Sequence, residues 1–152
     1  MKKEKSFQEF LKVVSQGELK EISLEEVRKI LRKNKLWINS KDKYGNTLLH
    51  YASANVNLEL IKLLKEFGAN FDVVNSNNWT LLHSAAYGMV NREENWEVIK
   101  YLLENGSNPK IEAVGGVTVE DILADEGFRL IEEYQKILNK KNQVESQQVI
   151  VI

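Results

Sequence analysis

The sequence predicts an all-α solenoid of stacked helix-turn-helix units joined by short β-hairpin-like loops. Its main signal is a repeat: residues 45–52 read GNTLLHYA and residues 78–85 read NWTLLHSA, with Thr, both Leu, His and Ala displaced by 33 residues. An apolar run with helical spacing follows each copy, and each run leads to a glycine turn. A fixed period of this length is typical of stacked repeats. The predicted unit is therefore helix, helix, turn.

The first helix of each unit should begin after a threonine. Thr47 and Thr80 stand where a side-chain oxygen can cap exposed N–H groups. The two Leu and the Ala that follow share the face turned toward neighbouring helices. The second helices should end at Gly68 and Gly106, because glycine adopts the left-handed backbone of a helix end without strain.

These residues resemble the ankyrin-repeat family, whose repeat reads G-x-T-P-L-H-x-A, then I-V-x-x-L-L, then G-A-D. Residues 39–109 carry the resemblance, with Leu48 and Leu81 in place of the family's proline. It implies that His50 and His83 are structural and tie each repeat to its hairpin by bonding neighbouring backbone. A metal-binding or catalytic histidine would need Cys or His partners, and the chain has no Cys and only these two His.

The flanking segments resemble degenerate copies that close the stack. Phe10, Leu11 and Val14 align with the first-helix motif, and residues 116–123 resemble a last-repeat variant. Terminal repeats need a polar outer face, which explains the missing motif residues. We expect one domain over residues 1–138, with four repeats at about 5–38, 39–71, 72–109 and 110–138.

Residues 139–152 should form a C-terminal tail that does not continue the repeat. The tail ends in four β-branched residues, which could add as a strand to a partner's sheet or enter a carboxylate-binding pocket. Folding onto the domain and disorder are the alternatives.

Two repeats carry a longer link between their helices. Gly17 to Val27 and Gly88 to Val98 are each ten residues apart, whereas Asn55 to Leu60 is five. Such insertions can belong to a binding surface or form loops without a role. Trp96, in the second insertion, is a candidate anchor that alternatively folds back onto the stack.

The family's geometry implies a binding surface on the concave side, lined by hairpin tips and first helices. Tyr51 and Tyr87 project from first helices, and large rigid rings are favoured anchors. A ring packed on the next hairpin would instead serve structure alone. The matching tip positions are Lys43, Tyr44 and Asn46, then Ser76, Asn77 and Trp79, then Val114, Gly115 and Val117.

Composition and charge limit the other function classes. The chain has no phosphate-binding, nucleophile-elbow or zinc-protease motif, so we expect no enzyme activity, cofactor or metal. Residues 1–43 hold twelve Lys or Arg against seven Asp or Glu, and residues 44–152 hold nine against fifteen. Because the basic residues alternate with Glu at helical positions, we expect neither nucleic acid nor membrane as a partner.

The expected function is non-enzymatic binding of another protein. The resemblance to small ankyrin proteins of host-associated bacteria and viruses suggests an adaptor or effector-like module. The alternative is an inhibitor that occludes its partner, in the manner of an antitoxin or of a protein that masks a transcription factor. Without an apolar leader, and with no cysteine, we expect a cytoplasmic or otherwise intracellular protein. Delivery to a host cell stays an open alternative.

Overall fold

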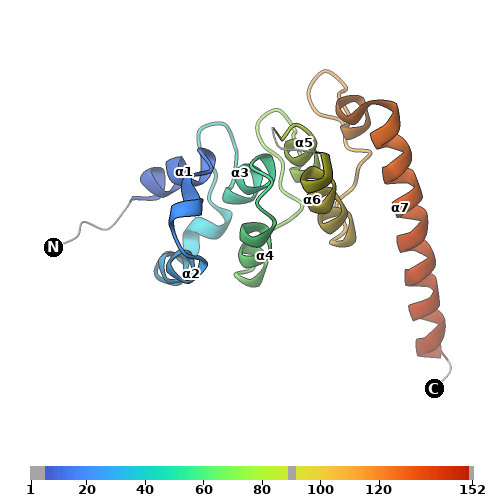
Figure 1. Ribbon diagram of the computed structural model, residues 1–152, viewed down its shortest axis with the longest axis horizontal. Coiled ribbons are helices and arrows are strands. Elements are labelled where there is room, and N and C mark those ends of the chain that lie inside the picture. Colours follow the sequence, from blue (N-terminus) through green and yellow to red (C-terminus); the bar gives the residue numbers. More distant parts are fainter. Residues whose placement is uncertain (1–5, 89–91, 151–152) are drawn as a thin grey trace.

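The computed structural model describes residues 6–88 and 92–150, and within these residues it is helical and contains no strand. Figure 1 shows the helices stacked side by side along the molecule, with the connecting hairpins in a row along one edge. The predicted all-α solenoid is confirmed. Its elements are α1 Phe7–Ser15, η1 Glu18–Glu21, α2 Leu24–Lys33, η2 Lys35–Asn39, α3 Leu48–Ala54, α4 Leu58–Glu66, α5 Leu81–Ala86, α6 Arg92–Glu104 and α7 Val119–Ile150.

The first helices form the central layer, where α3 packs between α1 and α5, and α5 packs against α7. Their motif side chains are the core: Leu82 and Ala85 of α5 are fully buried, and Leu49 and Ala52 of α3 are 1% exposed. The predicted inward face is confirmed. Small alanines let neighbouring helices approach closely, and the leucines fill the space between them.

The helix ends follow the predicted signals. Thr80 accepts a hydrogen bond from the backbone N–H of His83 at 3.3 Å, which caps α5. At the end of α4, Gly68 has φ 84°, and the N–H of the next residue, Ala69, bonds to Leu64 at 3.0 Å. Gly106 ends α6 in the same way, with φ 87°. Both glycine stops are confirmed.

The first insertion forms the short 3-10 helix η1, which buries Leu19 against the core. Of the second insertion, residues 89–91 lie outside the described residues. The remainder lengthens α6, which begins at Arg92, six residues before the buried Val98. The inserted residues that are described therefore extend helical structure.

The last element, α7, continues as helix past residue 138, where the sequence predicts the start of a C-terminal tail. A non-helical residue, Ala124 (φ 58°, ψ −174°), separates a short first segment from a long second one. The second segment continues through residue 139 to Ile150, and residues 151–152 lie outside the described residues. Its Lys, Glu and Gln favour a helix, and no Gly or Pro follows Gly127 to end it.

Candidate interaction surface

The first hairpin, between η2 and α3, is held in shape by the carboxylate of Asp42. Asp42 Oδ1 accepts hydrogen bonds from the backbone N–H groups of Tyr44 and Asn46, both at 2.9 Å, while the Asp42 N–H donates to the Asn46 carbonyl at 2.9 Å. The hydroxyl of Tyr51 donates to the other carboxylate oxygen. Gly45 at the tip has φ 76°, which only glycine adopts without strain. The tip is therefore a fixed turn.

The second hairpin repeats this design with an amide. Asn75 Oδ1 accepts from the N–H groups of Asn77 at 2.9 Å and Trp79 at 3.0 Å. Asn78 takes the left-handed place of Gly45, with φ 59°, a conformation that asparagine tolerates better than most residues.

Backbone hydrogen bonds join neighbouring hairpins. The N–H of Ser76 donates to the carbonyl of Tyr44 at 3.0 Å, and the N–H of Val114 donates to the carbonyl of Asn77 at 2.9 Å. A third turn is closed by the N–H of Ala113, which donates to the carbonyl of Val117 at 2.8 Å. The three hairpin tips therefore form one continuous row of hydrogen-bonded backbone.

Buried histidines tie this row to the helices. His50 is 2% exposed, and its Nδ1 accepts the backbone N–H of Thr47 at 3.1 Å. Its Nε2 must then carry the proton, and it donates to the carbonyl of Trp79 in the next hairpin at 3.1 Å. His83 repeats the arrangement with the carbonyl of Val117 at 2.9 Å. Burial lowers the pKa of His50 below its usual value.

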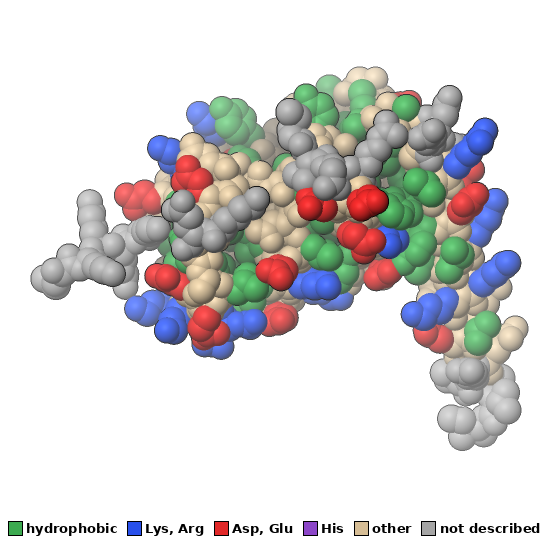
Figure 2. Space-filling model, viewed as in Figure 1, with side chains coloured by type: hydrophobic (Ala, Val, Ile, Leu, Met, Phe, Trp, Pro, Cys, Tyr) green, Lys and Arg blue, Asp and Glu red, His purple; other side chains and the backbone are tan. Residues whose placement is uncertain are grey.

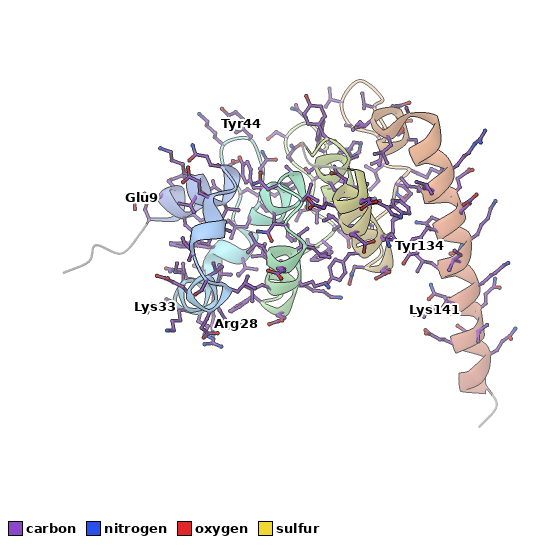
Figure 3. The ribbon with its side chains drawn as sticks, in the orientation of Figure 1. Glu9, Arg28, Lys33, Tyr44, Tyr134 and Lys141 are labelled. Carbon is purple, nitrogen blue, oxygen red and sulfur yellow. The ribbon has the colours of Figure 1, made fainter. Side chains whose placement is uncertain are left out.

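Exposed aromatic side chains lie along the row of hairpin tips. Tyr44 is 58% exposed and Tyr87 is 65% exposed. The half-buried ring of Trp79 lies edge to face with Tyr87, with 5.6 Å between ring centres, and 5.7 Å from the ring of His83. Tyr44 lies at the hairpin edge of the stack, and Arg28 lies at the opposite edge (Figure 3).

The other predicted tip residues also lie on this edge. Lys43 is exposed, with its ammonium 5.0 Å from the centre of the Tyr44 ring. Tyr51 is half-buried because its hydroxyl serves the first turn, and burial raises its pKa. We call the following set the hairpin surface: Lys43, Tyr44, Asn46, Tyr51, Ser76, Asn77, Trp79, Tyr87, Val114, Gly115 and Val117.

Trp96 lies apart from the hairpin surface. It is half-buried in α6, and its ring meets Tyr134 of α7 edge to face, with 6.0 Å between ring centres. The hydroxyl of Tyr134 donates to Glu104, and this hydrogen bond raises the pKa of Tyr134 to about 12. Of the two alternatives for Trp96, the structure shows the one in which the ring packs on its own stack.

Sequence reasoning missed the two residues that organise the turns, Asp42 and Asn75. They are 33 residues apart, so the period that revealed the Thr and His pairs could also have found them. Side chains of this type bond to backbone two residues ahead and so stabilise turns.

Charge and metal-binding groups are dispersed. At the N-terminal end, Lys and Arg side chains lie among Asp and Glu side chains (Figure 2). In the described part of the chain, no three His, Cys, Asp or Glu residues gather as metal ligands would. None of its helices is both long and apolar enough to cross a bilayer.

Comparison with known proteins places this fold in a family. A family model described as ankyrin repeats (3 copies) matches residues 19–113. The Notch-regulated ankyrin repeat-containing protein of Xenopus tropicalis is 47% identical over 51 residues, which are 34% of this chain and 45% of that protein. Protein phosphatase 1 regulatory subunit 12A of Mus musculus is 30% identical over 122 residues, 74% of this chain and 11% of that protein. The chain thus matches less than half the length of these relatives.

A solved structure shares the architecture. The crystal structure of an ankyrin repeat domain from Acinetobacter baumannii AYE superposes with a TM-score of 0.65 and 26% identity, covering 90% of this chain and 67% of the other. The ankyrin repeat is a general protein–protein interaction module. The repeated motif, the stacked helices and the family match agree, and the chain belongs to the ankyrin-repeat family.

Proposed function

We propose that this chain binds a partner protein through the hairpin surface and acts as an adaptor, with Tyr44, Trp79 and Tyr87 as anchors. The observation that carries the proposal is the exposure of aromatic rings on hydrogen-bonded backbone: Tyr44 is 58% and Tyr87 65% exposed, next to the ring of Trp79. Large aromatic side chains dominate the energetics of protein interfaces.

The fixed backbone favours binding. The turns of Asp42 and Asn75 and the bonds between neighbouring hairpins order the tips before any partner arrives. Binding then costs less conformational entropy than it would with flexible loops. The rings are also rigid, so they bury area with few rotamers lost.

The experiment is affinity capture from the native cell with three baits: the wild type, the double variant Tyr44→Ala/Tyr87→Ala and the control Leu36→Ala. Leu36 is 88% exposed in η2, so its truncation removes an exposed apolar side chain outside the hairpin surface. Circular dichroism checks that each bait is folded. We expect one or more proteins held by the wild type and the control and lost by the double variant. A partner retained by all three baits would move the site away from the hairpins.

The captured protein then decides between adaptor and inhibitor. An adaptor leaves its partner's activity intact at saturating concentration. An inhibitor that occludes the partner abolishes that activity through the same surface.

A further inference from the structure

Helix α7 carries a row of exposed apolar side chains. Leu130, Ile137 and Val144 are 45%, 59% and 53% exposed and are spaced seven residues apart. Seven residues advance a helix by 700°, only about 20° short of two turns. The three side chains therefore line one side of α7 over roughly 21 Å, at about 1.5 Å per residue.

The chain's own stack leaves this row uncovered. The face of α7 that meets the stack is marked by Ile131, which is 1% exposed, and by the half-buried Tyr134 and Leu138. Ile131 lies 100° around the helix from Leu130. The far end of α7 extends past the other helices (Figure 1), and every side chain over residues 139–147 is exposed. A row of aliphatic side chains exposed along one side of a helix indicates a surface that becomes covered.

We propose that this row is the interface between two copies of the chain, which pair their α7 helices antiparallel about Ile137. In this arrangement Ile137 faces Ile137 of the second copy. Leu130, seven residues before it, faces Val144, seven residues after it, and this contact forms twice. An isologous pairing of this kind uses the same patch on both copies and closes at two.

Charged residues beside the row select this register. Glu133 and Lys140, both exposed, lie about 40° and 60° from Ile137 on the same side of the row, one turn before it and one turn after. Antiparallel pairing about Ile137 places Glu133 of each copy against Lys140 of the other. Opposite charges across an interface fix the register and suppress wrong pairings.

Other arrangements lose this attraction or bring like charges together. A parallel pair would place Glu133 and Lys140 of one copy on the opposite side of the interface from those of the other copy, so their attraction would be lost. An antiparallel pair centred between Ile137 and Val144 would gather Lys140 and Lys141 of both copies at its centre. Figure 3 shows Lys141 on the part of α7 that extends past the stack, where no other helix lies beside it. Charge therefore disfavours both alternatives.

Sedimentation equilibrium of the full chain, over roughly 1 μM to 1 mM, tests for the dimer. The variants are Ile137→Glu and the control Gln143→Glu, which adds the same charge at an exposed position of α7 about 120° away from the row. We expect a concentration-dependent dimer for the wild type and the control, and a monomer for Ile137→Glu. A wild type that is monomeric throughout the range overturns the proposal, as does an Ile137→Glu variant that dimerises like the wild type.

Single cysteines test the geometry, because the chain contains none. Under mild oxidation Ile137→Cys should cross-link to itself, whereas Leu130→Cys should cross-link only when it is mixed with Val144→Cys. Gln143→Cys should stay uncoupled and measures the background. Self-coupling of Leu130→Cys would indicate parallel helices, and an uncoupled Ile137→Cys would remove the two-fold centre. Either result overturns the antiparallel register.

A charge swap tests the register independently. Glu133→Lys and Lys140→Glu should each weaken dimerisation about tenfold, because two attractive pairs become repulsive. The double variant Glu133→Lys/Lys140→Glu should restore the wild-type constant. A double variant that is weaker than either single variant would show that these residues do not face each other.

Discussion

Lowering the pH from about 7.5 to about 5.5, across the usual pKa of histidine, should destabilise the fold through His50. This side chain is 2% exposed and held between two backbone groups. Its Nδ1 accepts the N–H of Thr47, and its Nε2 donates to the carbonyl of Trp79. Protonation would put a second donor opposite the Thr47 N–H and bury a charge, so the folded chain favours the neutral ring.

The direction of the stability change with pH follows from the lowered pKa of His50. Burial is the largest cause that lowers the pKa of His50, and the hydrogen bond to Trp79 opposes it only in part. Below about pH 6.5, the value of an exposed histidine, the unfolded chain binds a proton that the folded chain does not. The stabilisation is therefore complete above about pH 6.5 and is lost as the pH falls toward the folded-state pKa. One such site changes the free energy of unfolding by at most about 1.4 kcal/mol per pH unit.

Urea unfolding followed by circular dichroism, at several pH values between about 7.5 and 5.5, measures this slope. The comparison variant is His50→Gln, which keeps an amide at the position but does not titrate. It should be less stable than the wild type at every pH, and its free energy should fall less steeply below about pH 6.5. Carboxylates contribute equally to both proteins and cancel in the comparison. Equal slopes would refute the role assigned to His50.

Three substitutions test the buried core, the first hairpin turn and the role of the Trp79 ring. Leu82→Ala, at a fully buried position of α5, should lower the free energy of unfolding in urea by about 2–5 kcal/mol. The control Leu36→Ala, at an exposed position, should change it by less than about 0.5 kcal/mol. A loss below about 0.5 kcal/mol for Leu82→Ala would place Leu82 outside the core. Gly45→Ala should lower the free energy of unfolding in urea, because φ is 76° and an added Cβ would lie 2.7 Å from a backbone nitrogen of the next hairpin. An unchanged free energy of unfolding would mean that the turn can relax. Trp79→Ala should leave the melting temperature nearly intact, and a large drop in calorimetry would make its ring structural.

The middle of the fold could be predicted because its residues have local tasks. A threonine that caps a helix and a glycine that ends one act within a few residues, so their spacing survives in the sequence. The 33-residue period then carried these assignments from one repeat to the next. The pairing of His50 with the carbonyl of Trp79 spans 29 residues, and only the resemblance to a family suggested such a tie.

The periphery was harder to predict because its conformation depends on tertiary contacts. Nothing local in the first insertion shows that Leu19 turns inward as part of η1. The sequence pattern predicts a tail from residue 139 but does not predict that residues 139–150 are helical, as they are in α7. The overlooked signal was the lack of a stop between Gly127 and the end of the helix, in a segment rich in helix-forming residues.

Trp79 shows how one residue can serve both the fold and the proposed binding. Its backbone carbonyl accepts the hydrogen bond from His50, while its half-buried ring lies beside the exposed Tyr87. The turn around it is set by the side chain of Asn75 and by backbone. A change of the Trp79 side chain therefore leaves the hydrogen bonds of the hairpin in place. Side chains on the hairpin surface can accordingly vary to suit a partner while the buried histidines and turn-forming residues keep its shape.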